Sequence, residues 1–189
     1  MEKIWLYLSL LLMIVYSISL ILVLFYSLSQ LNLLWNYVQY KKKKEKHPVL
    51  DISDPEKIPF VTIQLPVFNE LYVMERLLEC INLIDYPRTK LEIQVLDDST
   101  DESVELTRGL VENLKKGGLD ISQIRRKDRV GFKAGALKEG LITAKGEFIA
   151  IFDADFLPQS DWLLQTVPQF KNEEIGIVQT RWSHINRDY

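Results

Sequence analysis

Cysteine is almost absent from this sequence of 189 residues. Cys80 is the only one, which excludes an intrachain disulfide and a metal cluster built from thiolates. Internal repeats are lacking, and a run of lysines is the only low-complexity tract. The length allows one domain of ordinary size and an appendage. Because Cys80 falls on the apolar face of a predicted helix, we expect it in the core.

Charge is absent from residues 4–28. A helix of about 20 apolar residues can cross a bilayer, so this stretch is long enough. The alternative is a cleaved signal peptide, whose apolar core would cover about 7–15 residues and end at a cleavage site of small residues. Residues 27–30 fit such a site poorly. We therefore expect residues 1–40 to form a retained transmembrane helix and an interfacial segment rich in aromatic side chains.

A run of lysines follows this predicted membrane segment. Residues 41–46 read Lys-Lys-Lys-Lys-Glu-Lys. Positive charge beside a span favours the cytoplasmic side, so we expect the N-terminus outside and the rest of the chain in the cytoplasm, at the cell membrane. Nucleic-acid binding is the alternative for such a run. The adjacent span argues against it. Residues 1–50 carry +4, which leaves −7 of the total −3 for residues 51–189, and an acidic domain does not suit nucleic acid.

Prolines mark the end of the basic segment, and residues 41–59 are predicted to form a basic, proline-containing linker. The globular domain is expected at residues 60–189. Within it, apolar runs predict strands, and periodic apolar positions or capping patterns predict helices. Asn69 is the expected N-cap of the first of these helices. The expected strands are 60–65, 91–96, 121–124, 148–152 and 175–180, and the expected helices are 70–84, 99–116, 132–144 and 161–170.

Helices therefore alternate with strands along the domain. A helical connection forces parallel pairing, and right-handed crossovers then produce a doubly wound sheet. The predicted fold class is α/β, with a doubly wound, mostly parallel sheet that is preceded by a transmembrane helix.

Residues 148–155 read Phe-Ile-Ala-Ile-Phe-Asp-Ala-Asp, which predicts a strand buried on both faces and followed by Asp153 and Asp155. Carboxylates at that end of a strand emerge in the crevice where open α/β sheets bind ligands. They repel each other unless a cation lies between them, and Mg²⁺ or Mn²⁺ with a diphosphate is a common solution. The alternative is that both acids cap the next helix, and this stretch alone leaves both possibilities open.

Polar groups also follow the first two domain strands, namely residues 66–70 and Asp97-Asp98-Ser99. A turn with Gly131 and Lys133 opens a helix, where an anion is favoured. The turn is neither a dinucleotide fingerprint, which should follow the first strand, nor a Walker loop, whose spacing is absent. Each group alone could be a helix cap or a solvated charge. Their occurrence together favours one ligand crevice.

These motifs resemble those of the inverting family 2 glycosyltransferases of the Rossmann-like GT-A fold. The sequence is most similar to the processive membrane synthases, which include cellulose synthase and the cellulose-synthase-like mannan synthases. The similar stretches follow the order of the family, at 65–70, 97–99, 131–136, 152–155 and 178–182.

The resemblance implies a role for each residue of the predicted site. Glu70 and Asp98, with backbone near Pro66, would hold the nucleotide base and ribose, and Lys133 would meet the diphosphate. Asp153 would contact the nucleotide side, and Asp155 with Asp153 would hold Mg²⁺ or Mn²⁺. The implied donor is UDP-glucose or GDP-mannose, the acceptor a glycan or a lipid, and the product a β-linked polysaccharide or glycoconjugate made at the bilayer.

The sequence departs from the family after residue 155. Family members carry a Thr-Glu-Asp stretch with the catalytic base and a Gln-x-x-Arg-Trp stretch that holds the acceptor. Neither is present, because Gln179-Thr180-Arg181-Trp182 is one residue too short and comes too early. We interpret the chain as the N-terminal part of a longer protein, with its general base beyond Tyr189. We therefore expect it to bind donor without transferring sugar.

Two other functions are alternatives to this one. A phosphatase with an aspartate nucleophile would carry Thr or Val two residues after Asp155, where Leu157 stands, and would use the first strand. A non-catalytic, membrane-anchored nucleotide-binding or scaffold protein is the second alternative. Titration with a sugar nucleotide, with and without Mn²⁺, separates all three functions.

The uncharged stretch and the lysines on one side of it predict the topology. A reporter that is active only in the cytoplasm should work when fused after Tyr189, because the positive side of a span stays inside. Activity of a reporter that requires the opposite side of the membrane would contradict this topology.

Overall fold

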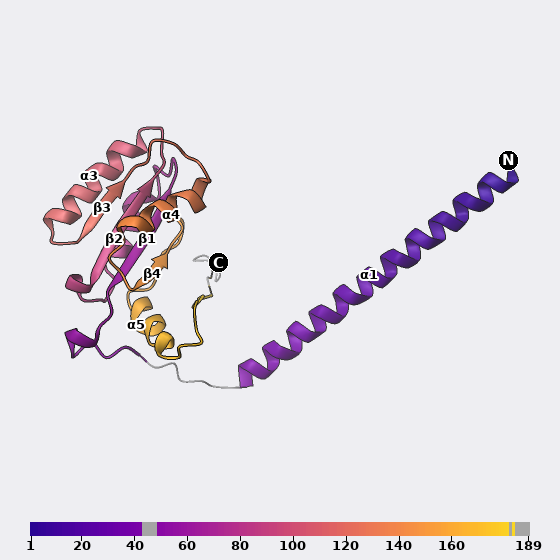
Figure 1. Cartoon of the computed structure of the whole chain (residues 1–189), viewed down its shortest axis with the longest axis horizontal. Helices are drawn as coiled ribbons and strands as arrows, with labels where there is room; N and C mark the ends of the chain where they lie inside the picture. The colour runs from indigo at the N-terminus through magenta and orange to yellow at the C-terminus, as the bar shows by residue number, and fades with distance from the viewer. Residues whose placement is uncertain (43–48, 182, 184–189) are drawn as a thin grey trace, which may run out of the picture. The chain divides into compact units, whose positions relative to one another are not determined.

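The computed structural model describes residues 1–42, 49–181 and 183 (Figure 1). Two compact units make up the chain, Met1–Lys46 and His47–Tyr189. Of the basic run, Lys43, Lys44 and Lys46 lie outside the described residues.

The first unit contains one continuous helix, α1 (Glu2–Lys42), which runs through the segment expected at the membrane interface. Its 41 residues correspond to about 60 Å, twice the thickness of a hydrocarbon core of about 30 Å. Serine hydroxyls donate to carbonyls one turn earlier, as Ser17 does to Met13 at 2.8 Å. By length and composition only, Lys3–Lys41 is long and apolar enough to cross a membrane, and its most apolar 18-residue window has a mean hydropathy of 2.8.

The second unit is built on a parallel sheet of four strands in the order β3-β2-β1-β4. This arrangement confirms the predicted α/β class. The chain adds β2 and β3 on one side of β1 and then returns to place β4 on the other side. Ligands bind at such a reversal, outside the carboxyl ends of the strands. The strands are β1 (Val61–Val67), β2 (Leu91–Asp97), β3 (Ile121–Ile124) and β4 (Phe148–Ile151).

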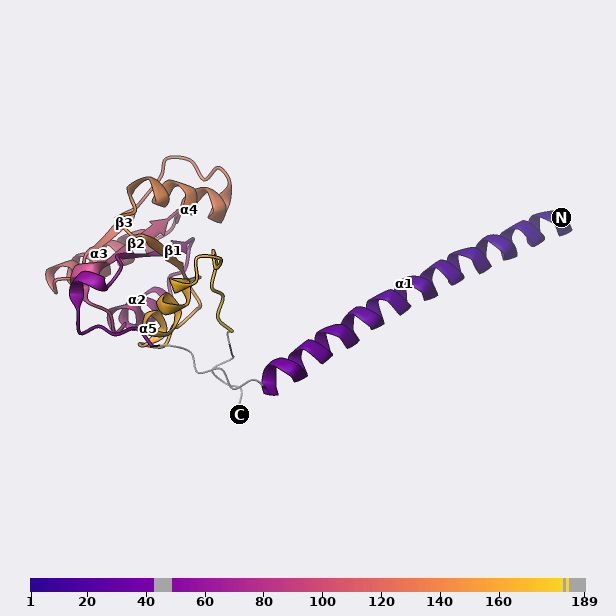
Figure 2. The same cartoon turned by 60° about the horizontal axis from the view of Figure 1, so that its bottom comes forward.

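Helices cover both faces of this sheet, and Figure 2 shows α4 on one face with α2 and α5 on the other. The reversal of strand order requires this, because a right-handed crossover in the opposite direction emerges on the opposite face. The helices are α2 (Met74–Asn82), α3 (Ser103–Lys116), α4 (Phe132–Thr143) and α5 (Trp162–Thr166), with short 3-10 turns η1 (Pro55–Lys57), η2 (Arg88–Lys90) and η3 (Val167–Lys171).

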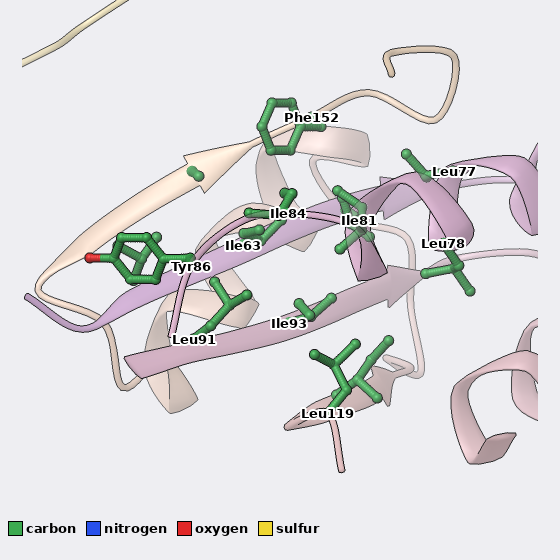
Figure 3. Close-up of a cluster of buried hydrophobic side chains, with 14 of the residues drawn as sticks. Ile63, Leu77, Leu78, Ile81, Ile84, Tyr86, Leu91, Ile93, Leu119 and Phe152 are labelled. Carbon is green, nitrogen blue, oxygen red and sulfur yellow. The ribbon is translucent and has the colours of Figure 1, made fainter. Parts of the chain in front are cut away.

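The apolar core lies between the sheet and α2 (Figure 3). Alternate residues of β1 and β2, such as Ile63 and Ile93, point into it and are fully buried. The helix contributes residues at i, i+3, i+4 and i+7 spacing, which confirms its predicted apolar face. These are Met74, Leu77, Leu78 and Ile81.

The opposite face of β1 and β2 is polar, although it is equally buried. Gln64 Nε2 donates to Gln94 Oε1 at 3.0 Å, and Gln94 Nε2 donates to Thr143 Oγ1 on α4 at 3.3 Å. Thr62 Oγ1 donates to the Glu92 carboxylate at 2.7 Å. Buried polar groups need partners, and the hydrogen bond from Gln94 to Thr143 is the one of these that joins α4 to the sheet.

One predicted strand is wrong. Residues 175–180 have no regular secondary structure, and Ile177 is 86% exposed. A strand needs an adjacent edge for its backbone hydrogen bonds, and none of the described strands pairs with these residues. Trp162 Nε1 donates to Thr180 Oγ1 at 3.0 Å and holds this segment instead.

The two turns after β1 and β2 also differ from expectation. Asn69 is not an N-cap, because its φ is 56° and α2 begins at Met74. Its side-chain oxygen accepts from Thr100 N at 2.9 Å, and its own N–H donates to Ser99 Oγ at 2.9 Å. Residues 99–102 have the spacing of a capping box, but Ser99 Oγ accepts from Asn69 N in the neighbouring turn, so this capping box does not form.

Pro66 lies inside β1 and does not end it. Gln64 O accepts from Phe152 N, so Gln64 and Pro66 both face β4, whose pairing ends at Gln64. The missing N–H of Pro66 thus costs no ladder hydrogen bond. β4 itself is only partly buried, contrary to expectation, because it has one described neighbour and Ile151 is 47% exposed.

Cys80 and the expected linker differ from prediction only in their burial. Cys80 is half-buried, and its Sγ donates to Pro158 O at 3.0 Å. Burial raises the pKa of this thiol. In the linker, Ile58 is buried and Leu50 N donates to Leu164 O at 2.8 Å, so part of this segment packs on the globular unit.

The close approach of α4 to the polar face predicts the effect of a mutation. At Gly140 an added Cβ would lie 2.5 Å from Gln64 Nε2 and 2.9 Å from Gln94 Oε1. Gly140→Ala should therefore destabilise the domain by about 1–3 kcal/mol in urea unfolding. Gly109→Ala in α3 is the matched control, because nothing lies within 4 Å and Ala favours a helix by about 0.5–1 kcal/mol. Equal changes in the free energy of unfolding for the two variants would contradict the close packing at Gly140.

Candidate functional site

A cleft of roughly 590 Å³ opens at the carboxyl ends of β1, β2 and β4. All six residues predicted from the sequence line it, namely Pro66, Glu70, Asp98, Lys133, Asp153 and Asp155. The other lining residues are Val67, Phe68, Leu96, Arg129, Ala136 and Ala154. Residues from four separate stretches of the sequence thus meet at one place.

Asp98 is the buried carboxylate of the cleft, with 7% of its side chain exposed. Arg126 donates to both of its oxygens, from Nε to Oδ1 at 2.7 Å and from Nη2 to Oδ2 at 2.6 Å. These hydrogen bonds raise the pKa of the Arg126 guanidinium. Asp98 therefore caps no helix. Its charge is compensated by a bidentate pair, the strong geometry for a buried carboxylate.

Arg126 also holds the loop before α4. Its Nη1 donates to Val130 O and its Nη2 to Phe132 O, both at 2.7 Å. The loop needs this support because Phe132 has a φ of 48°, a costly conformation for a bulky side chain. At Gly135 a Cβ would lie 2.0 Å from Val130 O and 2.4 Å from Arg126 Nη1. The glycine of this motif therefore makes room for the guanidinium.

Sequence reasoning missed Arg126. Its neighbours Arg125 and Lys127 are also basic, so its spacing carries no distinguishing pattern. The usable signal was its position two residues after β3, since strand ends of a parallel sheet meet at one edge. Arg125 points elsewhere and donates to Ser99 O at 2.7 Å.

Asp97 differs from Asp98 although the two are adjacent. It is fully buried, accepts from Ser99 N at 2.9 Å and accepts from Gln123 Nε2 at 2.6 Å. It therefore braces the turn after β2 and does not line the cleft.

Lys133 lies in the first turn of α4 and forms an ion pair with Asp153. Both side chains remain about half exposed, so a ligand can reach them. An anion that binds Lys133 competes with Asp153, and a cation that binds Asp153 competes with Lys133. A ligand with both charges, such as a metal diphosphate, satisfies both groups at once.

Asp153 and Asp155 fit a divalent cation that arrives with a ligand. Among the described residues, no group of three or more His, Cys, Asp or Glu could hold a metal by itself. Mg²⁺ and Mn²⁺ are commonly bound by one or two carboxylates together with substrate phosphates and water. Neither acid caps the next helix, whose N-cap position is Asp161.

The parallel sheet and its reversal at β1 define an α/β domain of the GT-A type. The family model "Glycosyl transferase family 2" matches residues 62–189. This chain therefore belongs to glycosyl transferase family 2, which confirms the resemblance found in its motifs.

Two curated relatives come from Oryza sativa subsp. japonica. "Probable glucomannan 4-beta-mannosyltransferase 11" is 45% identical over 133 residues, which is 68% of this chain and 23% of the relative. "Probable glucomannan 4-beta-mannosyltransferase 7" is 42% identical over 143 residues, which is 71% of this chain and 24% of the relative. The chain thus spans about a quarter of the length of these proteins.

Solved structures share the fold. The mannosyltransferase PcManGT from Pyrobaculum calidifontis, in complex with GDP-Man and Mn²⁺, is 34% identical with a TM-score of 0.62, over 76% of this chain and 41% of that chain. S. aureus TarS 1-349 is 23% identical with a TM-score of 0.51, over 60% and 32%. The second match concerns the fold alone.

The buried pair predicts a large loss of stability. Arg126→Met should destabilise the domain by about 3–5 kcal/mol, because it leaves the Asp98 carboxylate buried without its partner. Arg108→Met is the matched control, since its pair with Glu105 lies on the surface and contributes about 0–1 kcal/mol. Urea unfolding measures both, and similar small losses would show that Asp98 finds other partners.

Proposed function

We propose that this chain holds the donor site of a membrane-anchored inverting glycosyltransferase. The enzyme uses a nucleotide sugar to build a β-linked polysaccharide or glycoconjugate. One observation carries the proposal: the six residues chosen from the motifs line a single cleft at the reversal of the sheet. Open α/β sheets bind nucleotides at this position.

The relatives favour GDP-mannose over UDP-glucose as the donor. The curated relatives are named as mannosyltransferases, and the structure at 34% identity contains GDP-Man and Mn²⁺. The acceptor is a glycan or a lipid. No nucleic acid is involved, consistent with the acidic domain.

Each cleft residue has a proposed role. Glu70 and Asp98, with the backbone at Pro66, hold the base and ribose, and Lys133 meets the diphosphate. Asp153 contacts the nucleotide, and Asp155 with Asp153 holds Mg²⁺ or Mn²⁺. The cation stabilises the negative charge of the departing nucleoside diphosphate.

The charges of the described cleft support this assignment. Arg126 compensates Asp98 and Lys133 compensates Asp153, whereas Glu70 and Asp155 have no ion-pair partner among the described residues. A diphosphate alone would add further negative charge. A divalent cation offsets the negative charge of a nucleotide-sugar diphosphate, so the two together add no net charge to the cleft.

The proposed setting is the cell membrane. Residues 1–40 serve as the anchor, residues 41–59 as the linker, and residues 60–189 as the nucleotide-sugar domain on the cytoplasmic side. The length and apolar composition of α1 support the anchor. The cleft carboxylates are all assigned to the donor, so the general base comes from residues outside this cleft.

Calorimetry with GDP-mannose, with and without Mn²⁺, tests the site. Asp98→Ala should weaken binding in both conditions, because Asp98 serves the nucleoside. Asp155→Ala should remove only the gain from Mn²⁺, because it serves the cation. Thermal melts identify any variant that fails to fold.

Asp128→Ala is the matched control, since this carboxylate is exposed and does not line the cleft. Equal metal dependence in the Asp98 and Asp155 variants would mean that the roles are wrongly assigned. A chain that binds no sugar nucleotide under either condition would support the scaffold alternative instead.

A further inference from the structure

Arg129 lines the cleft but has no role in the proposed function. Its Cζ lies 3.4 Å from the centroid of the Phe68 ring and 5.2 Å from that of Phe132. A guanidinium at this distance stacks its flat face on the aromatic ring. Stacking leaves the in-plane N–H donors of Arg129 directed away from the ring.

Those donors are largely unused. Arg129 Nε lies 3.7 Å from Asp98 Oδ2, close enough for charge attraction but too far for a hydrogen bond. Within residues 1–42, 49–181 and 183, no group accepts a hydrogen bond from its guanidinium, and 38% of the side chain is exposed. Its fork of N–H groups is therefore available to a ligand in the cleft.

The strand order indicates which part of the ligand Arg129 meets. β1 lies between β2 and β4, so Asp98 after β2 and Asp153 after β4 are on opposite sides of the cleft. With a cation and diphosphate at Asp153 and Asp155, the nucleoside extends toward Asp98. This step rests on the proposed function.

We propose that Arg129, beside Asp98, selects guanine as the base of the donor nucleotide. Guanine carries two adjacent acceptors, N7 and O6, next to the N1 and N2 donors, and arginine commonly binds the first two as a fork. The Asp98 carboxylate has about four acceptor positions. Arg126 uses one position on each oxygen, so the outer position of Oδ2, the oxygen near Arg129, remains for a guanine N–H donor.

Other bases do not match this order of donors and acceptors. Uracil alternates acceptor, donor and acceptor along its edge, and adenine places its amino donor directly beside N7. The two N–H donors of Arg129 need two adjacent acceptors on the base, and the Asp98 carboxylate needs a donor next to them. Of these bases, only guanine offers this order. Lysine cannot replace this arginine, because an ammonium is a point charge without a planar fork.

Calorimetry on the full 189-residue chain in detergent micelles, with Mn²⁺ present, tests the inference. The ligands are GDP, 7-deaza-GDP, which lacks the N7 acceptor, and UDP. The wild-type chain should bind GDP more tightly than the other two. Arg129→Met should weaken GDP binding by about 10- to 100-fold and leave UDP binding unchanged, and Arg129→Lys should not restore GDP binding.

Lys127→Met is the matched control, because it removes a positive charge from the same loop outside the cleft. Thermal melts confirm that each variant is folded. Equal losses for GDP and UDP in Arg129→Met would place the fork on the phosphates and overturn the inference. Unchanged GDP binding in Arg129→Met would overturn it while leaving the proposed function intact. A wild-type preference for UDP would overturn both the inference and the choice of GDP-mannose as donor, but not the donor site itself. A wild-type chain that binds no nucleoside diphosphate would overturn both.

Discussion

The ion pair between Asp98 and Arg126 is the interaction on which the cleft depends. It joins the end of β2 to the residues after β3, and the same guanidinium holds two carbonyls of the loop that leads into α4. A buried carboxylate is costly unless it is paired and hydrogen-bonded. Here the pairing also stabilises a loop with two consecutive positive φ angles, at Gly131 and Phe132. Burial of one charge therefore orders the loop that carries Arg129 and Lys133.

The helices on the two faces of the sheet are held by different kinds of interaction. Apolar packing places α2, since residues of that helix and alternate residues of β1 and β2 form one core. On the other face, α4 is joined to the sheet by a hydrogen bond from Gln94 to Thr143 in a buried polar layer. Directional bonds specify a position more narrowly than apolar contact does. The helix that presents Lys133 to the cleft is the one held by such bonds.

A parallel sheet that reverses direction at β1 brings loops from distant stretches to one edge. In this chain the edge collects acidic side chains and a few basic ones, and each basic side chain contacts an acid. Arg126 contacts Asp98, Lys133 contacts Asp153, and Arg129 lies near Asp98. These pairs compensate two of the four cleft carboxylates, Asp98 and Asp153, and leave Glu70 and Asp155 without an ion pair among the described residues.

Much of the fold and of the cleft was predictable from the sequence. The α/β class and four of the five expected strands follow from local patterns, because the period of apolar residues, proline and glycine act within a few positions along the chain. The six cleft residues follow from motifs that resemble those of the family. Tertiary structure alone decided the rest. The side chain of Asn69 accepts a hydrogen bond from Thr100 N and does not cap a helix. Residues 175–180 form no strand because no strand edge lies beside them. Arg126, and not Arg125, pairs with Asp98. Each of these outcomes depends on a partner that is distant in sequence, and local patterns carry no information about such partners.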